Sequence, residues 1–562
     1  MNPFSRRSLL KAGTGLVAGV SLTNFTGCPD PEPSEPTNLT VQFANLTLAG
    51  YNVRLRTYGG AIPGPTVRTK PGAKLSFHID NQLPPYDSTA WASLTGLSDT
   101  VKMNIPHHLN TTNLHVHGLE VVPHLFEPVG TEDPSARMIA IEPGSQKDYT
   151  FELPDDHPTG LYWYHPHHHG STAVQVGNGM AGLIIVKGAI DEVPEIAAAK
   201  DCPIAVQDVG LFESQSQPGV WSYDPPQNAI WDTFAGTASV KNGQGATIAP
   251  ADSGFTTGDF PLRLFLVNGA PVFQETHNAA SPTQPLGKEL LDTVPIYKVR
   301  PGEVVRFRML NGCSDNMIPL EVQGHTMYLL AMDGVNYPAP RERPYNPDAV
   351  DGQEQVLLAP GGRAEFLIKG STTPGVYSIM QLAQKQQFLE SQAKVLAQIK
   401  ITGDPMDMPL PKSLPLPKRH YPLISEIGTR RDISFDMMFP PTQNLVVGLD
   451  FAVNGSLYEE TATPVQVKLG AVEEWTIHDN GHHTNSSNEG HPFHLHTNSF
   501  EVISVGDQLM EPGTIQDTVW VPHNTPVVIR IKFKEWTGKD VFHCHIIPHE
   551  DAGMMQNLLV TK

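Results

Sequence analysis

Hydrophobic and polar residues alternate along much of this chain, in short runs that end at Gly, Pro or Asn. Residues 75–79 read Leu-Ser-Phe-His-Ile, residues 304–308 read Val-Val-Arg-Phe-Arg, and residues 474–477 read Glu-Trp-Thr-Ile. A period of two places apolar side chains on one face of an extended segment, so each run predicts a half-buried β-strand. Signals for helix capping are sparse, and Gly and Pro are abundant, with 48 and 51 residues. The pattern therefore predicts an all-β protein with many turns.

The same local pattern recurs three times. A turn containing Gly precedes each of these strands and an Asn closes it, at residues 71–81, 301–311 and 470–480. Repeats at such wide spacing predict three β-sandwich domains. The Pro-rich stretch at 403–419 is typical of a linker. We predict a first domain at 38–190, a second at 200–402 and a third at 420–562.

The first 28 residues predict an export signal rather than part of the fold. Arg6 and Arg7 precede an apolar run at 12–20 that is too short to span a bilayer. A twin arginine in this place is typical of signals for proteins that fold before export. Residues 25–28 also resemble a lipoprotein cleavage box ending at Cys28, and the linker at 29–37 would suit a tether. We expect a periplasmic or exported protein, with a lipid anchor at Cys28 as an open alternative.

Charge and cysteine usage narrow the classes of partner. The 562 residues carry a formal net charge of −20 without a cluster of Lys or Arg, which argues against nucleic acid or an anionic membrane as a partner. No segment after the signal is long and apolar enough to predict a transmembrane helix. The four cysteines are too few for a disulfide framework, and Cys202 and Cys313 either pair or remain separate thiols. We expect a monomer.

Histidine is concentrated in the first and third repeats. A His-x-His pair on a strand directs two imidazoles to one face, where they can reach one metal ion or two neighbouring ions. The four pairs are His115/His117, His165/His167, His494/His496 and His543/His545. The second repeat has only the isolated His325 in a comparable context, and we interpret it as structural. We therefore predict that the outer two domains share metal ions and that the middle domain is a spacer.

The C-terminal segment adds sulfur to this pattern. Cys544 lies between His543 and His545, and His549 and Met554 follow shortly after. If the segment is a strand, alternation places Cys544 on the face opposite its neighbours, so one strand would serve two metal centres. Thiolate, imidazole and a weak axial thioether are the ligands of a blue-copper site. Zinc also accepts imidazole and thiolate, but eight histidines without paired carboxylates fit a four-ligand structural zinc site poorly, so we predict copper.

These motifs together resemble those of the multicopper oxidases, the family of laccases, bilirubin oxidases and bacterial cuprous oxidases. The resemblance covers the chain after the signal, with the motifs in the same order. It implies three cupredoxin-like Greek-key β-sandwich domains. It also implies four copper ions: one type 1 ion in the third domain, and a trinuclear cluster of one type 2 and two type 3 ions between the first and third domains.

The resemblance assigns copper ligands position by position. The type 1 ligands would be His491, Cys544, His549 and an axial Met554. The type 2 ligands would be His115 and His494. The type 3 ligands would be His117, His165, His167, His496, His543 and His545. His168 and His169 extend the second motif and are expected outside the ligand set.

The resemblance also implies a reaction. A reducing substrate would give electrons one at a time to the type 1 site, and Cys544 would pass them to the cluster, where dioxygen becomes two waters. Because that reduction consumes protons, a carboxylic acid is expected beside the cluster. Glu550, directly after His549, matches an acid of bacterial relatives. Asp133 is the nearest counterpart of a second acid, with Glu127 or Glu132 as alternatives. Asp517 is expected to hold copper ligands in position without binding copper itself.

Three functions follow from these features. The first is a laccase-like oxidase of phenols or aromatic amines with dioxygen as acceptor. The second is a cuprous oxidase for copper tolerance, for which cuprous ion would be the reductant. Only Met406, Met408, Met437 and Met438 lie near the junction of the second and third domains, and isolated Met is usually core filler. The third is a non-catalytic copper-binding or scaffold protein, which the complete ligand set disfavours.

Overall fold

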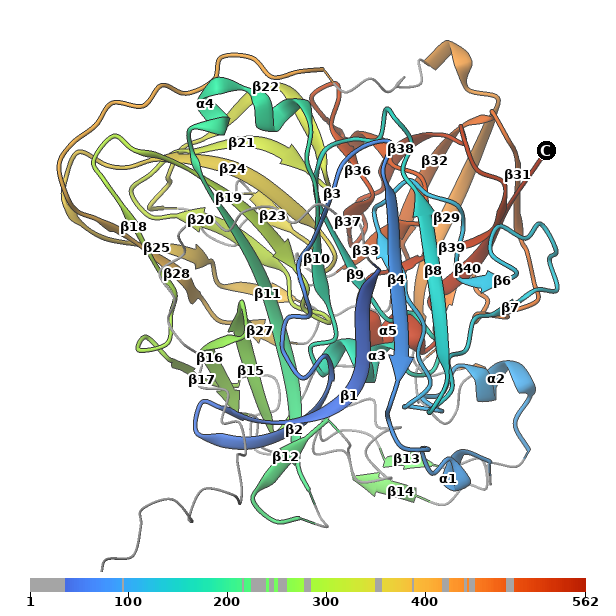
Figure 1. Ribbon diagram of the computed structural model, residues 1–562. Coiled ribbons are helices and arrows are strands. Elements are labelled where there is room, and N and C mark those ends of the chain that lie inside the picture. The colour runs from blue at the N-terminus through green and yellow to red at the C-terminus, as the bar shows by residue number, and fades with distance from the viewer. Residues whose placement is uncertain are drawn as a thin grey trace, which may run out of the picture. The chain divides into compact units, whose positions relative to one another are not determined.

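The computed structural model describes most of the chain after residue 35 (Figure 1). The predicted export signal and Cys28 lie outside the described residues, as does most of the linker at 29–37. Where the structure is described, no helix has the length and apolar character needed to cross a membrane. The described residues are 36–92, 96–214, 217–223, 239–241, 247–250, 260–276, 285–348, 356–386, 389–416, 424–438, 442–443, 450–481 and 490–562.

The first domain is a sandwich of two sheets that pack on one shared core. Alternating side chains of both sheets, among them Phe77, Val116 and Ile184, form that core. Its outer sheet contains β1 (Thr37–Leu48), β2 (Tyr51–Tyr58), β4 (Lys74–Asn81) and β8 (Gln146–Glu152). Its second sheet contains β3 (Val67–Thr69), β5 (His115–His117), β9 (Gly160–His165) and β10 (Gly182–Val186).

The second domain has its own core, which includes Phe307, Leu320 and Ile379. One sheet contains β11 (Lys200–Glu213), β15 (Leu262–Val267), β16 (Ala270–Thr276), β17 (Leu286–Glu289), β19 (Val304–Asn311), β21 (Met327–Met332), β22 (Val335–Arg343) and β24 (Arg363–Lys369). The other contains β18 (Ile296–Val299), β20 (Ile318–Val322), β23 (Val356–Leu358), β25 (Gly375–Gln381) and β28 (Lys394–Ile401). The short strand β12 (Val220–Ser222) pairs with both β11 and β2, so the outer sheets of the first two domains form one continuous sheet.

The third domain repeats the arrangement around Trp475, Phe493 and Phe542. One sheet contains β29 (Thr429–Met438), β30 (Asp450–Val453), β32 (Val472–Asp479), β34 (Phe500–Val505), β35 (Gln508–Leu509), β36 (Ile515–Gln516) and β38 (Val527–Lys532). The other contains β31 (Val465–Lys468), β33 (Gly490–Leu495), β37 (Thr518–Pro522), β39 (Gly538–Cys544) and β40 (Met555–Thr561).

Helices and small hairpins occupy the connections. The α-helices are α1 (Thr89–Ala92), α2 (Asp99–Met103), α3 (Thr172–Gly177), α4 (Pro194–Ala197) and α5 (Ile547–Asp551), with 3-10 turns η1 (Ala189–Glu192) and η2 (Ile424–Glu426). The hairpins are β6 (Phe126–Glu127) with β7 (Arg137–Met138), β13 (Ser239–Lys241) with β14 (Thr247–Pro250), and β26 (Gln384–Gln386) with β27 (Leu389–Ser391). Figure 1 shows α3 beside α5, although one belongs to the first domain and the other to the third.

The sheets confirm the predicted all-β fold of three sandwiches. The order β3-β10-β9-β5 recurs as β18-β28-β25-β20 and as β31-β40-β39-β33, with the same parallel and antiparallel pairings. The predicted domain boundaries remain predictions. Met408 and Leu414 of the predicted linker are buried against residues of the second domain, so this stretch lies along that domain.

One detail of the predicted repeat is displaced by a residue. Asn81 and Asn311 are the last residues of β4 and β19, and each side-chain oxygen accepts a hydrogen bond from the backbone N–H two positions later. In the third domain Asp479 ends β32 and makes this contact, whereas the sequence pattern points to Asn480. A carboxylate oxygen accepts the same hydrogen bond as an amide oxygen, so Asp479 is the structural counterpart of the two asparagines.

Candidate metal centre

Strand pairing brings the four His-x-His motifs together. His115 on β5 pairs with His165 on β9, and His494 on β33 pairs with His543 on β39. The two strand pairs belong to different domains, yet their imidazoles stack: ring centroids are 3.9 Å apart for His115 and His496. All eight histidines are at most 1% exposed. The structure therefore gathers every predicted ligand of the trinuclear cluster into one buried group.

Ring nitrogens in this group approach one another at the spacing of ligands that share an ion. The Nε2 atom of His543 lies 3.1 Å from Nε2 of His167 and 3.1 Å from Nε2 of His496. The Nδ1 atom of His117 lies 3.2 Å from Nε2 of His545. Imidazole nitrogens bind transition metals at about 2.0–2.1 Å, so two adjacent ligands of one ion lie about 3 Å apart. The arrangement fits metal ions between the rings.

Hydrogen bonds donated by the outer ring nitrogens fix which nitrogen faces inward. His165 donates through Nδ1 to the Pro166 carbonyl at 2.9 Å, and His543 donates through Nδ1 to the Cys544 carbonyl at 2.8 Å. The Nδ1 of His496 lies 3.1 Å from the Asp540 carboxylate. With the outer nitrogen protonated, the inner nitrogen keeps its lone pair for a metal ion. Among the described residues the inner Nε2 atoms of His165 and His494 have no hydrogen-bond partner.

A histidine outside the predicted ligand set supports the first motif. His124 is 2% exposed, and its Nε2 accepts a hydrogen bond from the Val116 backbone N–H at 3.1 Å. Nδ1 of His115 lies 3.3 Å from the same nitrogen and donates to it, which leaves Nε2 of His115 free for a metal ion. Sequence reasoning missed His124 and Asp540 because neither belongs to a repeated spacing.

Burial keeps these imidazoles neutral, which is the form that binds metal. Desolvation lowers the pKa of His543 to about 4 and that of His165 to about 3. The pKa of His115 is lowered well below its usual value, first by burial and then by the neighbouring His496 ring. Eight neutral rings with converging lone pairs are a poor arrangement without a cation, because the lone pairs repel one another.

A second group lies on the other face of β39. His491 on β33, Cys544 at the end of β39 and His549 on α5 place their donor atoms within reach of one ion. Sγ of Cys544 is 3.4 Å from Nδ1 of His491 and 3.9 Å from Nδ1 of His549. Burial raises the pKa of the Cys544 thiol, so metal binding there would release a proton. One thiol and two imidazoles are the core of a blue-copper ligand set.

The backbone holds the fourth predicted residue beside this group. The Met554 carbonyl accepts a hydrogen bond from the Cys544 N–H at 3.0 Å, and the Met554 N–H donates to the His549 carbonyl at 3.0 Å. The Met554 side chain is fully buried in the core of the third domain. The predicted alternation along β39 is thus present: Cys544 faces one group, and His543 and His545 contact the other.

Glu550 lies next to the histidine cluster. Its Oε1 is 3.4 Å from Nδ1 of His167, and its Oε2 is 3.8 Å from Nδ1 of His543. Burial raises its pKa well above the usual value, and the neighbouring Asp551 adds to the effect. Asp551 accepts hydrogen bonds from the backbone N–H groups of Gly170 at 2.5 Å and Ala173 at 2.9 Å, so it joins α5 to the start of α3.

Asp133 lies in a different environment. It is exposed in the connection between β6 and β7, where its carboxylate accepts hydrogen bonds from the Ser135 N–H and hydroxyl. These hydrogen bonds lower its pKa. The alternative Glu127 is also exposed and pairs with Lys147 at 2.9 Å. The assignment of Asp133 as a proton donor remains a prediction, without a contact to the histidines among its hydrogen bonds.

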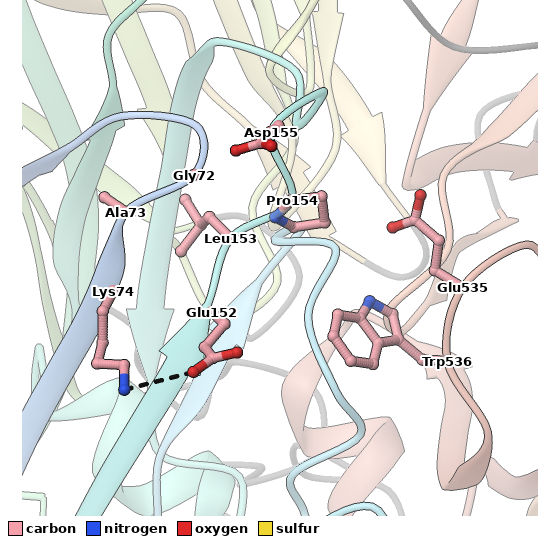
Figure 2. A pocket seen from close by; sticks show the side chains of 9 residues that line it. All are labelled: Gly72, Ala73, Lys74, Glu152, Leu153, Pro154, Asp155, Glu535 and Trp536. Atoms are coloured by element: carbon pink, nitrogen blue, oxygen red, sulfur yellow. Dashed lines mark ion pairs between the residues drawn. The ribbon is translucent and has the colours of Figure 1, made fainter.

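Two other features bear on the predictions. The structure records Cys202 and Cys313 as free thiols. Residues 72–74 and 152–155 of the first domain line a pocket of about 530 Å³ together with Glu535 and Trp536 of the third. Figure 2 shows these side chains. None of the residues that line this pocket is a predicted ligand, so it is separate from the candidate metal centre.

Comparison with known proteins places these observations in a family. Models described as multicopper oxidase match residues 95–190, 244–399 and 429–562. The multicopper oxidase MmcO of Mycobacterium tuberculosis is 25% identical over 589 residues, which cover 99% of this chain and 96% of that protein.

Two solved structures share the fold. A multicopper oxidase from Campylobacter jejuni, described as a metallo-oxidase, has a TM-score of 0.64 at 22% identity and covers 93% of this chain and 91% of its own. A laccase-like multicopper oxidase from the lignin-degrading Ochrobactrum sp. has a TM-score of 0.64 at 20% identity and covers 94% of this chain and 98% of its own.

Proposed function

The chain belongs to the multicopper oxidase family, and on that premise we propose that it oxidises phenols or aromatic amines as a laccase does. Members of the family bind four copper ions, one type 1, one type 2 and two type 3, and are oxidoreductases with dioxygen as acceptor. Bound copper supplies the one-electron transfers from the donor and the four-electron reduction of dioxygen to water.

The observation that carries the proposal is the sharing of β39 between two donor groups. We assign His491, Cys544, His549 and Met554 to type 1 copper, on the contacts given above. The two flanking residues, His543 on β39 and His545 directly after that strand, belong to the buried histidine group, so the path from sulfur to those imidazoles runs through covalent bonds of three consecutive residues. A short covalent path is what efficient electron transfer between two centres requires.

We assign the remaining eight histidines to the trinuclear cluster. Their burial keeps water out and keeps the rings neutral. The type 2 ligands are His115 and His494. The type 3 ligands are His117, His165, His167, His496, His543 and His545.

Glu550 is proposed as the acid that holds a proton for oxygen reduction. It is fully buried and within 3.4 Å of His167, and its raised pKa favours the protonated form. A carboxylic acid that stays protonated at neutral pH can give its proton to the reaction and be refilled afterwards. Asp133 stays a second candidate, and its exposed position makes it the weaker of the two.

The methionines near the junction of the second and third domains bear on the identity of the donor. Met408 and Met437 pack in hydrophobic cores, and Met406 and Met438 pack against those cores, which is the ordinary use of isolated Met. This favours an organic donor. The alternative is cuprous ion, and the metallo-oxidase description of the Campylobacter jejuni protein keeps that alternative open. A scaffold without activity is disfavoured, because a side chain that can bind copper stands at every assigned ligand position.

The experiment is an optical spectrum of copper-loaded protein together with oxygen uptake. An intense blue band with a near-ultraviolet shoulder, and faster uptake with a phenol than with cuprous ion, are expected. Faster uptake with cuprous ion would replace the organic donor by the metal ion. A colourless protein that consumes no oxygen at full copper loading would refute the oxidase proposal.

We also propose export by the twin-arginine route and a monomeric state. Replacing Arg6 and Arg7 by Lys should leave the protein in the cytoplasm, which cell fractionation measures. The variant Cys28→Ser should release the protein from membranes only if Cys28 is lipidated. Light scattering of the purified protein should give the mass of one chain, 61.4 kDa before processing.

A further inference from the structure

We propose that the middle domain supplies a positioning residue, Arg363, which orients two histidines of the cluster through Asp517. The inference rests on the copper cluster proposed above. The middle domain carries none of the assigned ligands, and its sequence suggests a spacer. Its contacts with the cluster indicate a more specific role.

Arg363 is the first residue of β24 and is completely buried. Its guanidinium donates two hydrogen bonds to the Asp517 carboxylate, from Nη1 to Oδ1 at 2.7 Å and from Nη2 to Oδ2 at 2.6 Å. Its Nε donates to the Leu161 carbonyl on β9 at 3.2 Å. One side chain of the middle domain therefore contacts both outer domains, in the bidentate geometry that an arginine forms and a lysine does not.

Asp517, which Arg363 holds in place, contacts two of the assigned ligands. Its Oδ1 lies 3.1 Å from Nε2 of His117, and its backbone carbonyl accepts a hydrogen bond from Nδ1 of His494 at 2.8 Å. These partners hold protons on the outer nitrogens, so Nδ1 of His117 and Nε2 of His494 keep their lone pairs. The two rings stack with centroids 3.8 Å apart, so a rotation of one displaces the other. Such outer contacts set the orientation and the protonation of metal ligands.

Asp333, also from the middle domain, holds the other side of this contact. Its Oδ1 accepts a hydrogen bond from the Arg363 backbone N–H at 2.8 Å, and its Oδ2 accepts from the backbone N–H groups of Asp517 and Thr518, both at 3.2 Å. Asp333 and Gly334 form the two-residue turn between β21 and β22, with φ of 45° and 79°, and Asp-Gly is a favoured pair for a turn with positive φ at both positions. This tight turn holds Asp333 against both the Arg363 backbone and the Asp517 backbone.

The glycines around Arg363 show how closely the middle domain approaches the cluster. A Cβ on Gly118, the residue after the first His-x-His motif, would collide with the Arg363 guanidinium and the Asp517 carboxylate. A Cβ on Gly361 would lie 2.9 Å from Nε2 of His545 and 3.0 Å from Cε1 of His117. Both positions are therefore restricted to glycine by the contact between domains. The segment of the middle domain that contains Gly361 and Arg363 thus borders the cluster.

A purely structural role for Arg363 makes a different prediction from a positioning role. A structural ion pair would lower the stability of the whole protein and reduce the copper of both centres equally. A positioning residue would weaken copper binding in the cluster. It would leave type 1 copper unchanged, because Asp517 is not in the group formed by His491, Cys544 and His549.

The test uses the full chain with the variants Arg363→Met and Arg363→Lys. The control is Arg308→Met, because Arg308 is equally buried in the same domain and pairs with Asp201, Asp191 and Glu365, away from the ligands. Each protein is loaded with copper and titrated with a chelator. Total copper, the blue absorbance of type 1 copper and the electron paramagnetic resonance signal of type 2 copper are followed.

Arg363→Met should lose type 2 copper at a chelator concentration about 10- to 100-fold lower than the unaltered protein, with the blue absorbance retained. Arg363→Lys should fall between them, because lysine keeps the charge without the bidentate geometry. Arg308→Met should lower the melting temperature and leave the ratio of type 2 to type 1 copper unchanged. Loss of both copper types at the same chelator concentration in Arg363→Lys would overturn the inference. So would a fall in the ratio of type 2 to type 1 copper in Arg308→Met as large as that in Arg363→Met. An unaltered protein without a blue band would refute the proposed function instead.

Discussion

The second sheets of the middle and third domains share one topology and differ in chemistry. In the third domain β33 and β39 place Phe493 opposite Cys544 and His494 opposite His543. In the middle domain the corresponding strands β20 and β25 place Leu320 opposite Gln381. Leu320 belongs to an ordinary hydrophobic core, and Gln381 is hydrogen-bonded to Asn316. The same backbone therefore supports either a metal-binding face or a plain core, and the side chains decide which.

The difference also shows what each domain needs for stability. The middle domain buries apolar side chains that stabilise it without a ligand. The outer domains bury imidazoles whose inner nitrogens face one another, so part of their stability has to come from bound metal. The middle domain is nevertheless more than the predicted spacer, because Arg363 and Asp333 contact Asp517 beside the cluster.

The largest expected effect comes from removing the sulfur ligand. Cys544→Ser should abolish the blue absorption and reduce turnover to background, because the oxygen of serine cannot replace a thiolate on type 1 copper. Absorption spectra and oxygen uptake measure both. The matched variant is Cys313→Ser in the middle domain, where the thiol is equally buried. It should keep colour and activity and cost about 1–3 kcal/mol of stability from a buried hydroxyl. Loss of the blue band in the control would contradict the comparison.

The next effect concerns the buried acids. Glu550→Gln should slow turnover about 10²- to 10⁴-fold, because an amide cannot supply the proton that oxygen reduction consumes. Reduction of the blue band by the donor under anaerobic conditions should remain fast, and stopped-flow absorbance separates the two steps. Glu321→Gln is the control from β20, where burial also raises the pKa of a carboxyl. A slow donor step in Glu550→Gln would place the residue in electron entry rather than in oxygen reduction.

Copper removal should affect the domains unequally. Removal of each copper ion should cost about 2.7 kcal/mol of stability, relative to protein at a free copper concentration of 100 times the dissociation constant of that site. Amide hydrogens of β5, β33 and β39 should exchange faster, while those of β19 and β24 stay protected, which hydrogen-exchange mass spectrometry measures. Uniform loss of protection across all three domains would show that the middle domain depends on metal as much as the others.

The apoprotein should also be sensitive to acid. Burial lowers the folded-state pKa of His543 to about 4 and that of His165 to about 3, below the usual value of 6.5 for an unfolded chain. The unfolded state therefore binds more protons below pH 6.5, so stability is full above that pH and declines as the pH falls toward 4 and then 3. Thermal melts of copper-free protein across this range should show a falling melting temperature. A melting temperature independent of pH between 6.5 and 4 would contradict the burial argument.

The smallest effect is expected at the histidine of the middle domain. His325 donates from Nδ1 to the Gln323 carbonyl at 2.8 Å and accepts from the Ser371 N–H at 3.2 Å. His325→Ala should lower the free energy of unfolding by about 1 kcal/mol, the net value of a typical hydrogen bond, and leave copper content unchanged. Denaturant unfolding and metal analysis test both parts. Any loss of copper in this variant would end its interpretation as a structural residue.

Strand type and ligand chemistry were the predictable parts of this protein. The alternation at residues 75–79 and 304–308 predicts the strands that become β4 and β19, because period-two patterns depend only on neighbours in sequence. The strand β12, which links two sheets, has no such signal. The roles of Asp540 and His124 were also missed, because a single polar residue in a strand or loop gives no sign of what it will face.

Sequence patterns were enough to predict an all-β protein of three sandwiches and to place the predicted copper ligands in the first and third, because periodicity and donor type are local properties. The packing of the domains sets which nitrogen of each ring faces inward, and it brings Glu550, rather than the exposed Asp133, beside the cluster. His117 and Asp517, for example, are 400 residues apart in the chain and 3.1 Å apart in space. Contacts of this kind arise from the packing of three separate cores, which no short sequence pattern encodes.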